Sequence, residues 1–200
     1  MIVNLLLGIT GVILFLFVFW KRLKEDYSST IIFQVASGIL AGLTLGLVLS
    51  RLIAPSWFFW ISFFGALLGT AVMIYRFKLR FYETLEALIL ASMPIVSMMF
   101  FKDSIINSSL TSFLAFVAIL VLIFLSYWFD ISYKNLTWYK SGKIGFAGLS
   151  TAILLFFTRF IVAIGGLTMI SFVDKIDPVF SGIFTVISIV LLINLGRKEK

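Results

Sequence analysis

The residue in this chain whose setting most strongly suggests chemistry is a single arginine, Arg159. It lies inside the apolar run GFAGLSTAILLFFTRFIVAIGG, from Gly145 to Gly166, which is long enough to span a bilayer. An arginine at depth in a membrane is costly, so such residues tend to face a protein interior or a wet cavity. Its guanidinium can hold two phosphate oxygens in a fixed fork. Arg159 is therefore a candidate site for an anionic lipid headgroup.

Two arrangements of Arg159 are open from the residues alone. Steps of three and four residues place Gly148, Ala152, Leu155, Ala163 and Gly166 on its own helical face. The small residues among them are expected where helices approach closely. In the other arrangement the side chain extends to water. At about 1.5 Å per residue, Arg159 lies roughly 22 Å into a core of about 30 Å, near enough to one surface to reach it.

Composition places the chain among integral membrane proteins. Of its 200 residues, 62% are hydrophobic and 12% are charged, with a mean hydropathy of +1.15, so a soluble domain could not bury its apolar surface. There is no cysteine and no histidine, which excludes disulfides and a thiol nucleophile and removes the commonest general base and metal ligand. We therefore expect no metal site and no cofactor.

Seven apolar segments are expected to form transmembrane helices in one all-α domain covering residues 1–200. Their ranges are 2–20, 31–50, 57–75, 81–101, 110–128, 144–166 and 178–195. One side collects most of the basic residues, namely Lys21, Arg22, Lys24, Arg76, Lys78, Arg80, Lys134, Lys140, Lys143, Arg197, Lys198 and Lys200. The other side has Arg51, Lys102 and Lys175. The positive-inside rule then predicts an outside N-terminus and a cytoplasmic C-terminus, and the net charge of +7 reflects orientation, not a nucleic-acid partner.

Glycines at four-residue spacing predict close helix packing. The second span has Gly42 and Gly46, the third has Gly65 and Gly69, and the sixth has Gly148. We therefore expect the second, third and sixth spans to form the packed centre around the Arg159 site.

The acidic residues do not indicate a catalytic pair. Glu83 and Glu86 fall in the first turns of the fourth span, where the helix dipole and nearby arginines favour carboxylates. Asp174 and Asp177 are assigned to a loop before Pro178, which suits the first turn of the last helix. No nucleotide-binding glycine loop, metal cluster or catalytic triad can be read from the sequence.

Three stretches resemble one known family. The segment ISFFGALLGT (61–70) resembles a motif that reads S-F-H-G-G-x-x-G, and GLTLGLVL (42–49) resembles G-A-R-L-G-Y-V. The pieces GKIGFAGL and TRFIVA, within 142–163, resemble G-x-x-x-G-L-F-L leading to Y-G-x-x-R-F-x-x-E. With the order of spans, these stretches make the chain similar to the bacterial prolipoprotein diacylglyceryl transferases.

The resemblance implies transfer of a diacylglyceryl group from phosphatidylglycerol to the thiol of a lipobox cysteine, in the bacterial cytoplasmic membrane. Its partners would be an anionic phospholipid such as phosphatidylglycerol and lipoprotein precursors. Arg159 matches the family's headgroup arginine, and Gly65 and Gly69 match its glycines. Phe64 stands where the family has its histidine, and Ala163 stands where it has a glutamate.

Two hypotheses follow from the match and its departures. The chain is a divergent transferase that uses Arg159 and an unidentified carboxylate or the lipid itself as base, or it is a non-catalytic relative that binds phospholipid or a partner helix. The feature that separates them is whether polar groups converge on Arg159. A small transporter is less favoured, because no persuasive internal repeat is present.

Overall fold

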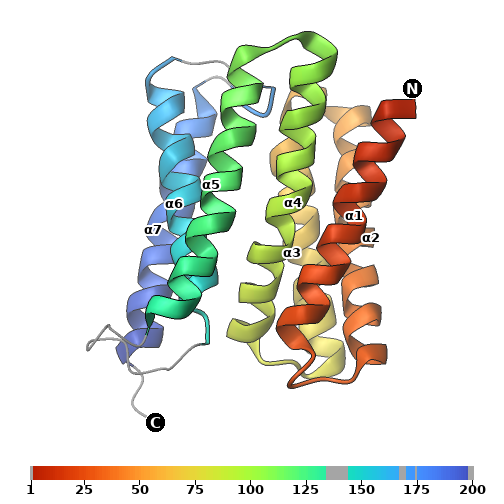
Figure 1. Ribbon diagram of the computed structural model, residues 1–200, viewed down its shortest axis with the longest axis vertical. Helices are drawn as coiled ribbons and strands as arrows, with labels where there is room; N and C mark the ends of the chain where they lie inside the picture. The colour runs from red at the N-terminus through yellow and green to blue at the C-terminus, as the bar shows by residue number, and fades with distance from the viewer. Residues whose placement is uncertain (1, 134–143, 167–169, 174, 198–200) are drawn as a thin grey trace.

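The computed structural model describes residues 2–133, 144–166, 170–173 and 175–197 (Figure 1). Its helices are α1 (Ile2–Leu23), α2 (Ser29–Ile53), the short 3-10 helix η1 (Pro55–Trp57), α3 (Phe58–Phe77), α4 (Phe81–Asn107), α5 (Leu110–Ser132), α6 (Phe146–Ile164) and α7 (Ile176–Arg197). Seven of these are long and apolar enough to cross a membrane. The prediction of an all-α, multi-pass membrane protein is confirmed.

Most helices extend a few residues beyond the predicted apolar spans. Helix α4 continues to Asn107, six residues past the predicted end at Phe101, and α1 includes Lys21 and Arg22. Helical hydrogen bonds satisfy the backbone N–H and C=O groups in the headgroup region as well as in the hydrocarbon core. Polar residues can therefore form the last turn of a membrane-spanning helix. The assignment of Asp177 to a loop is wrong, because α7 begins at Ile176 and Pro178 occupies its first turn.

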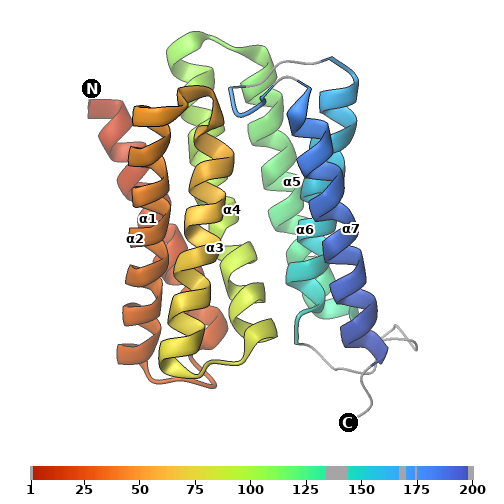
Figure 2. The ribbon, with the colours of Figure 1, turned by 180° about the vertical axis from the view of Figure 1, so that it is seen from behind.

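The helices pack in two groups that share α4 (Figures 1 and 2). In one group α2 packs against α3, and α1 packs against α4; in the other α6 packs against α7 and α5. Helix α4 contacts α1 and α3 on one side and α5 and α6 on the other. The core of the first group is apolar and includes Phe15, Phe19, Ile32, Val35 and Ile39. An aromatic cluster around Trp60 joins α3 to α6 and α7.

The α2–α3 crossing is as close as its glycines predict. An added Cβ at Gly46 would lie 2.7 Å from the Cα of Ser62, and one at Gly69 would lie 2.9 Å from the carbonyl oxygen of Gly38. A Cβ at Gly42 would overlap the carbonyl oxygen of Gly65. Backbone therefore meets backbone along this pair.

The sixth span does not join that crossing, so the predicted three-helix centre is wrong. A Cβ at Gly148 would lie 2.7 Å from the Cα of Glu86, which places this glycine against α4. Near the start of α6 the facing helix is α4, and α6 meets α3 further along through the aromatic side chains around Trp60. A small residue predicts a close neighbour but does not identify which helix it is.

A charged network ties the helices together at the end that carries Lys21 and Arg80, here called the basic end. The Arg22 guanidinium lies 2.8 Å from the carboxylate of Asp130 and 3.6 Å from that of Glu86. The other oxygen of Glu86 accepts a 2.6 Å hydrogen bond from the backbone N–H of Gly145. Glu86 and Asp130 thus link α1, α4, α5 and the start of α6. Lys134, Lys140, Lys143, Lys198 and Lys200, assigned to the same end from the sequence, lie outside the described residues.

The orientation in the membrane stays a prediction, and cysteine accessibility tests it. The native chain has no cysteine, so single substitutions label without background. Ser171 is fully buried, which makes the exposed Lys175 the better probe of its loop. We expect Ser104→Cys and Lys175→Cys to react with a membrane-impermeant maleimide from outside, and Ser28→Cys to react only after permeabilisation. The reverse pattern would invert the orientation.

Candidate functional site

Arg159 faces the protein interior. Its side chain is 7% exposed, although it lies in the last two turns of α6, where a side chain could have extended to the membrane surface. The buried face of α6 includes Gly148 and Ala152, two of the small residues on the predicted stripe. Of the two arrangements left open by the sequence, the structure has the inward one.

A carboxylate lies directly against the guanidinium. Nη2 of Arg159 donates to both oxygens of Asp177, at 2.8 Å to Oδ1 and 3.0 Å to Oδ2. Asp177 is fully buried in the first turn of α7. Nη1 donates to the Ser171 hydroxyl at 2.9 Å, and Nη2 lies 3.2 Å from the Ser171 carbonyl oxygen. Polar groups from α6, α7 and the loop between them therefore converge on one point.

Trp60 of α3 completes the polar cluster. Its indole Nε1–H donates to Oδ1 of Asp177 at 2.7 Å, and the ring is fully buried. One carboxylate thus accepts hydrogen bonds from a tryptophan in the first group of helices and an arginine in the second. The Trp60–Asp177 hydrogen bond thus links α3 to α7, and the Arg159–Asp177 pair links α6 to α7.

Aromatic rings enclose the cation. The guanidinium carbon lies 3.9 Å from the ring centre of Phe59, 4.8 Å from that of Phe172 and 5.5 Å from that of Trp60. A desolvated cation over an aromatic face is stabilised by about 2 kcal/mol or more. These rings replace part of the hydration that Arg159 loses in the bundle, and together with Asp177 they make its burial possible.

Two polar atoms in this region have no hydrogen-bond partner within the described residues. They are Nε of Arg159 and the hydroxyl of Ser181, which lies one helical turn after Asp177. A buried donor without a partner costs about 1–3 kcal/mol. The Nε–H donor of the Arg159 guanidinium is therefore available, and an oxygen atom of a ligand could accept a hydrogen bond from it.

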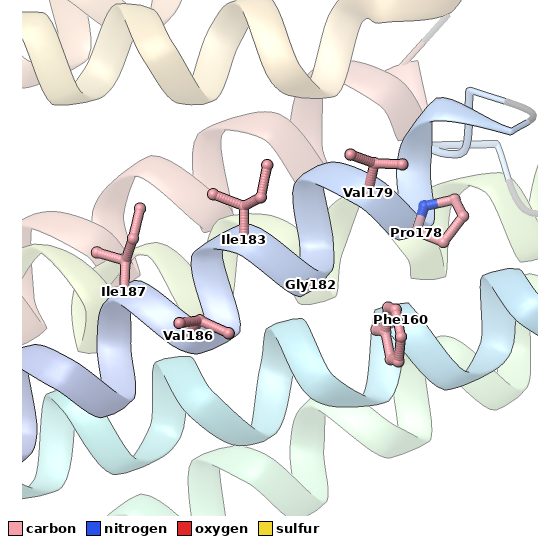
Figure 3. Close-up of a pocket in the computed structure, with 7 residues that line it drawn as sticks. All are labelled: Phe160, Pro178, Val179, Gly182, Ile183, Val186 and Ile187. Carbon is pink, nitrogen blue, oxygen red and sulfur yellow. The ribbon is translucent and has the colours of Figure 1, made fainter.

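An apolar groove runs along α7 from Pro178. Figure 3 shows Phe160 of α6 opposite Pro178 and Gly182 of α7, and the groove continues along Ile183 and Ile187. A Cβ at Gly182 would lie 3.3 Å from the Phe160 ring, so the glycine leaves room for that ring. Phe160 and Pro178 directly follow Arg159 and Asp177 in sequence. The groove can accept an acyl chain whose headgroup lies at the level of the ion pair.

The position that matches the family histidine is part of the aromatic cluster. The Phe64 ring lies 6.3 Å from that of Trp60, 6.2 Å from that of Phe180 and 5.9 Å from that of Phe184. The phenyl ring of Phe64 carries no group that can take up or release a proton, so it cannot act as a base. Among the described residues, the carboxylate that contacts Arg159 is that of Asp177, and both of its oxygens already accept hydrogen bonds.

The other predicted site residues lie elsewhere. Gly42, Gly46, Gly65 and Gly69 form the α2–α3 crossing, and Gly148 lies against α4. In the part of the chain that the structure describes, the groups that contact the guanidinium come from the start of α3, residues 171–172 and the start of α7. The glycines thus shape the bundle, and the aromatic and polar residues form the site.

Sequence reasoning missed Asp177, Ser171, Trp60 and Phe59. One signal for Asp177 was available: a charge inside the membrane needs a partner, and Asp174 and Asp177 are the first acids after Arg159 across a helical hairpin. Trp60 lies 99 positions before Arg159, so only the folded arrangement reveals it.

No protein-family model, curated protein or solved structure matches this chain. Within the described ranges, no group of three or more Asp or Glu side chains is placed to hold a metal ion.

Proposed function

We propose that this protein is a non-catalytic membrane protein that binds the phosphate of an anionic phospholipid at Arg159, and that it lies in the bacterial cytoplasmic membrane. The observation that supports the proposal is a buried guanidinium whose Nε–H has no partner among the described residues. An apolar groove lined by Phe160 and Pro178, the residues that follow Arg159 and Asp177 in sequence, supplies a surface for an acyl chain. A phosphate oxygen would satisfy Nε, and one acyl chain would lie in the groove along α7. The family resemblance points to the same class of ligand.

Asp177 determines how strongly such a lipid binds. Its carboxylate neutralises Arg159 and occupies Nη2, so an incoming phosphate competes with it for the guanidinium. The site is therefore weak while the ion pair is closed and strong when the pair opens. This competition makes the proposal testable by a substitution that removes the competitor and keeps its shape.

The substitution is Asp177→Asn, which preserves the acceptor for the Trp60 indole and removes the charge. We expect the affinity for phosphatidylglycerol to rise roughly tenfold or more, since a charge-assisted hydrogen bond contributes about 1.5–3 kcal/mol. Native mass spectrometry of the protein from nanodiscs, with phosphatidylcholine of the same acyl chains as reference, measures the occupancy. Melting temperature gives a second readout, because a ligand that binds only the folded state stabilises it.

The matched control is the double variant Arg159→Gln, Asp177→Asn, which is neutral at both positions. It should lose the gain in phosphatidylglycerol binding while keeping the same response to phosphatidylcholine. Equal phosphatidylglycerol occupancy in the parent, the single variant and the double variant would show that Arg159 is not a headgroup ligand.

Diacylglyceryl transfer is the second candidate, and one observation favours it: polar groups do converge on Arg159, and they include a carboxylate. If phosphate binding to Arg159 released Asp177, that carboxylate would be the group available to take the proton of a lipobox thiol. Complementation separates the two candidates. Both proteins are expressed in cells depleted of the authentic transferase. Transfer would be supported if the parent restored lipoprotein modification and Asp177→Asn did not. We expect that neither protein restores it.

A further inference from the structure

A second hollow lies at the basic end, on the lipid-facing side of α2 and α3. Helix α2 contributes Thr30, Phe33, Gln34 and Ser37, whose spacing of three, one and three residues places them on one helical face. All four are exposed, and three of them are polar. Gln34 is five residues from the start of α2 at Ser29, or about 7.5 Å along the axis, which is the depth of the headgroup region.

Helix α3 contributes the other wall, with Met73, Arg76 and Phe77. Met73 packs directly onto Gly38 of α2, so the floor of the hollow is flat and apolar. Arg76 is exposed in the last turn of α3 and lies with its guanidinium carbon 5.5 Å from the ring centre of Phe77. The hollow therefore combines an apolar floor with a positively charged rim.

The charge of Arg76 is not neutralised within the described residues. Arg76 takes part in none of the salt bridges between described residues, which involve Arg22, Arg80 and Arg159. The side chains of Arg76 and Gln34 also make no hydrogen bond to the described part of the chain, which leaves their N–H groups available. The N-terminus of α2 adds the positive end of its dipole at the same level, with no side-chain cap from Ser28.

We infer that this hollow binds an anionic phospholipid of the leaflet at the basic end. Arg76 and Gln34 donate to the phosphate, Thr30 donates from the start of α2, and an acyl chain lies on Met73 and Phe33. A phospholipid fits better than a soluble anion, because the floor is apolar and the site opens toward the hydrocarbon. This site is separate from Arg159 and lies at the opposite end of the bundle, so it does not rest on the function proposed above.

Lipid binding in a background without the Arg159 charge tests the inference. The full-length Arg159→Gln, Asp177→Asn protein is reconstituted in nanodiscs that contain phosphatidylcholine with increasing phosphatidylglycerol, and native mass spectrometry counts the retained lipids. We expect Arg76→Gln to weaken phosphatidylglycerol binding roughly ten- to a hundredfold, since it removes a charge-assisted contact. Arg76→Lys should keep part of the affinity, because the charge stays and the fork is lost. Phosphatidylcholine binding should not change.

The matched control is Arg51→Gln, which removes another exposed arginine, at the far end of α2 from the hollow. It should leave phosphatidylglycerol binding unchanged. Gln34→Leu supplies an independent variant that retains all charges, and we expect it to weaken binding severalfold. If Arg51→Gln and Arg76→Gln weaken binding equally, or if neither Arg76→Gln nor Gln34→Leu weakens it, the hollow is not a phospholipid site. Failure of the Arg159 proposal would leave this result unaffected.

Discussion

Removing either partner of the Arg159–Asp177 pair alone should destabilise the protein by about 3–5 kcal/mol, because the remaining charge is left buried without a counterion. Both residues are buried: Arg159 exposes 7% of its surface and Asp177 exposes none. Arg159→Met and Asp177→Leu are suitable single variants, since methionine nearly preserves the volume of arginine and leucine keeps the branched shape of aspartate. The free energy of unfolding can be measured by reversible denaturation in mixed micelles.

The double variant Arg159→Met, Asp177→Leu should be more stable than the sum of the single effects predicts. A well-packed apolar pair often replaces a buried ion pair at little cost, so the coupling free energy should be at least about 2 kcal/mol. Arg22 and Asp130 form the comparison pair, because their side chains are 22% and 16% exposed and the solvent screens their interaction. Additive effects at Arg159 and Asp177 would mean that the two charges are not paired in the folded protein.

Substituting Gly42 or Gly65 by alanine should also have a large effect. The added Cβ at either position would overlap a backbone carbonyl oxygen of the facing helix, and backbone cannot move aside as a side chain can. We expect each variant to lose about 1–3 kcal/mol of stability, the usual cost of overpacking, and Gly42→Leu to lose more.

Gly8→Ala is the control for this series. Apart from the adjoining backbone of its own helix, nothing lies within 4 Å of a Cβ at Gly8, so the substitution changes only the intrinsic preference for helix. That preference favours alanine by about 1 kcal/mol, and the variant should be as stable as the parent or more so. If Gly42→Ala behaves like Gly8→Ala, α2 and α3 do not cross at the distance described here.

The number and order of the helices could be predicted because apolar length is a local property of the sequence. Their ends were less predictable, since polar residues such as Lys21 and Asp103 lie within helices that continue past the apolar core. The close approach at Gly42 and Gly65 was foreseen correctly. The partner of Gly148 was not, because a small residue permits contact with any neighbour and the sequence does not say which helix lies opposite.

The candidate site was predictable only in its central residue. A lone arginine in an apolar span is visible in the sequence, and so is its need for a buried environment. Its surroundings depend on how α3 meets α6 and α7, which brings Trp60 and Phe59 to a residue about one hundred positions away. Asp177 was hidden for a different reason: it was assigned to a loop, where a carboxylate is normally solvated, whereas it is in fact the second residue of α7.

The contact between Arg159 and a lipid phosphate can be measured directly by solid-state NMR. Arginine labelled with ¹³C at Cζ is incorporated into the Asp177→Asn protein in phosphatidylglycerol bilayers, and dephasing by ³¹P reports the distance from Cζ to phosphorus. The spectrum of the same protein with Arg159→Lys added lacks the Arg159 signal, so subtracting it from the first spectrum identifies that signal. A phosphate held by the guanidinium places phosphorus within about 5 Å of Cζ, given N–H···O distances of about 2.8 Å. We predict strong dephasing of that signal in Asp177→Asn and weaker dephasing in the parent. No dephasing in either protein would show that Arg159 does not hold a lipid phosphate.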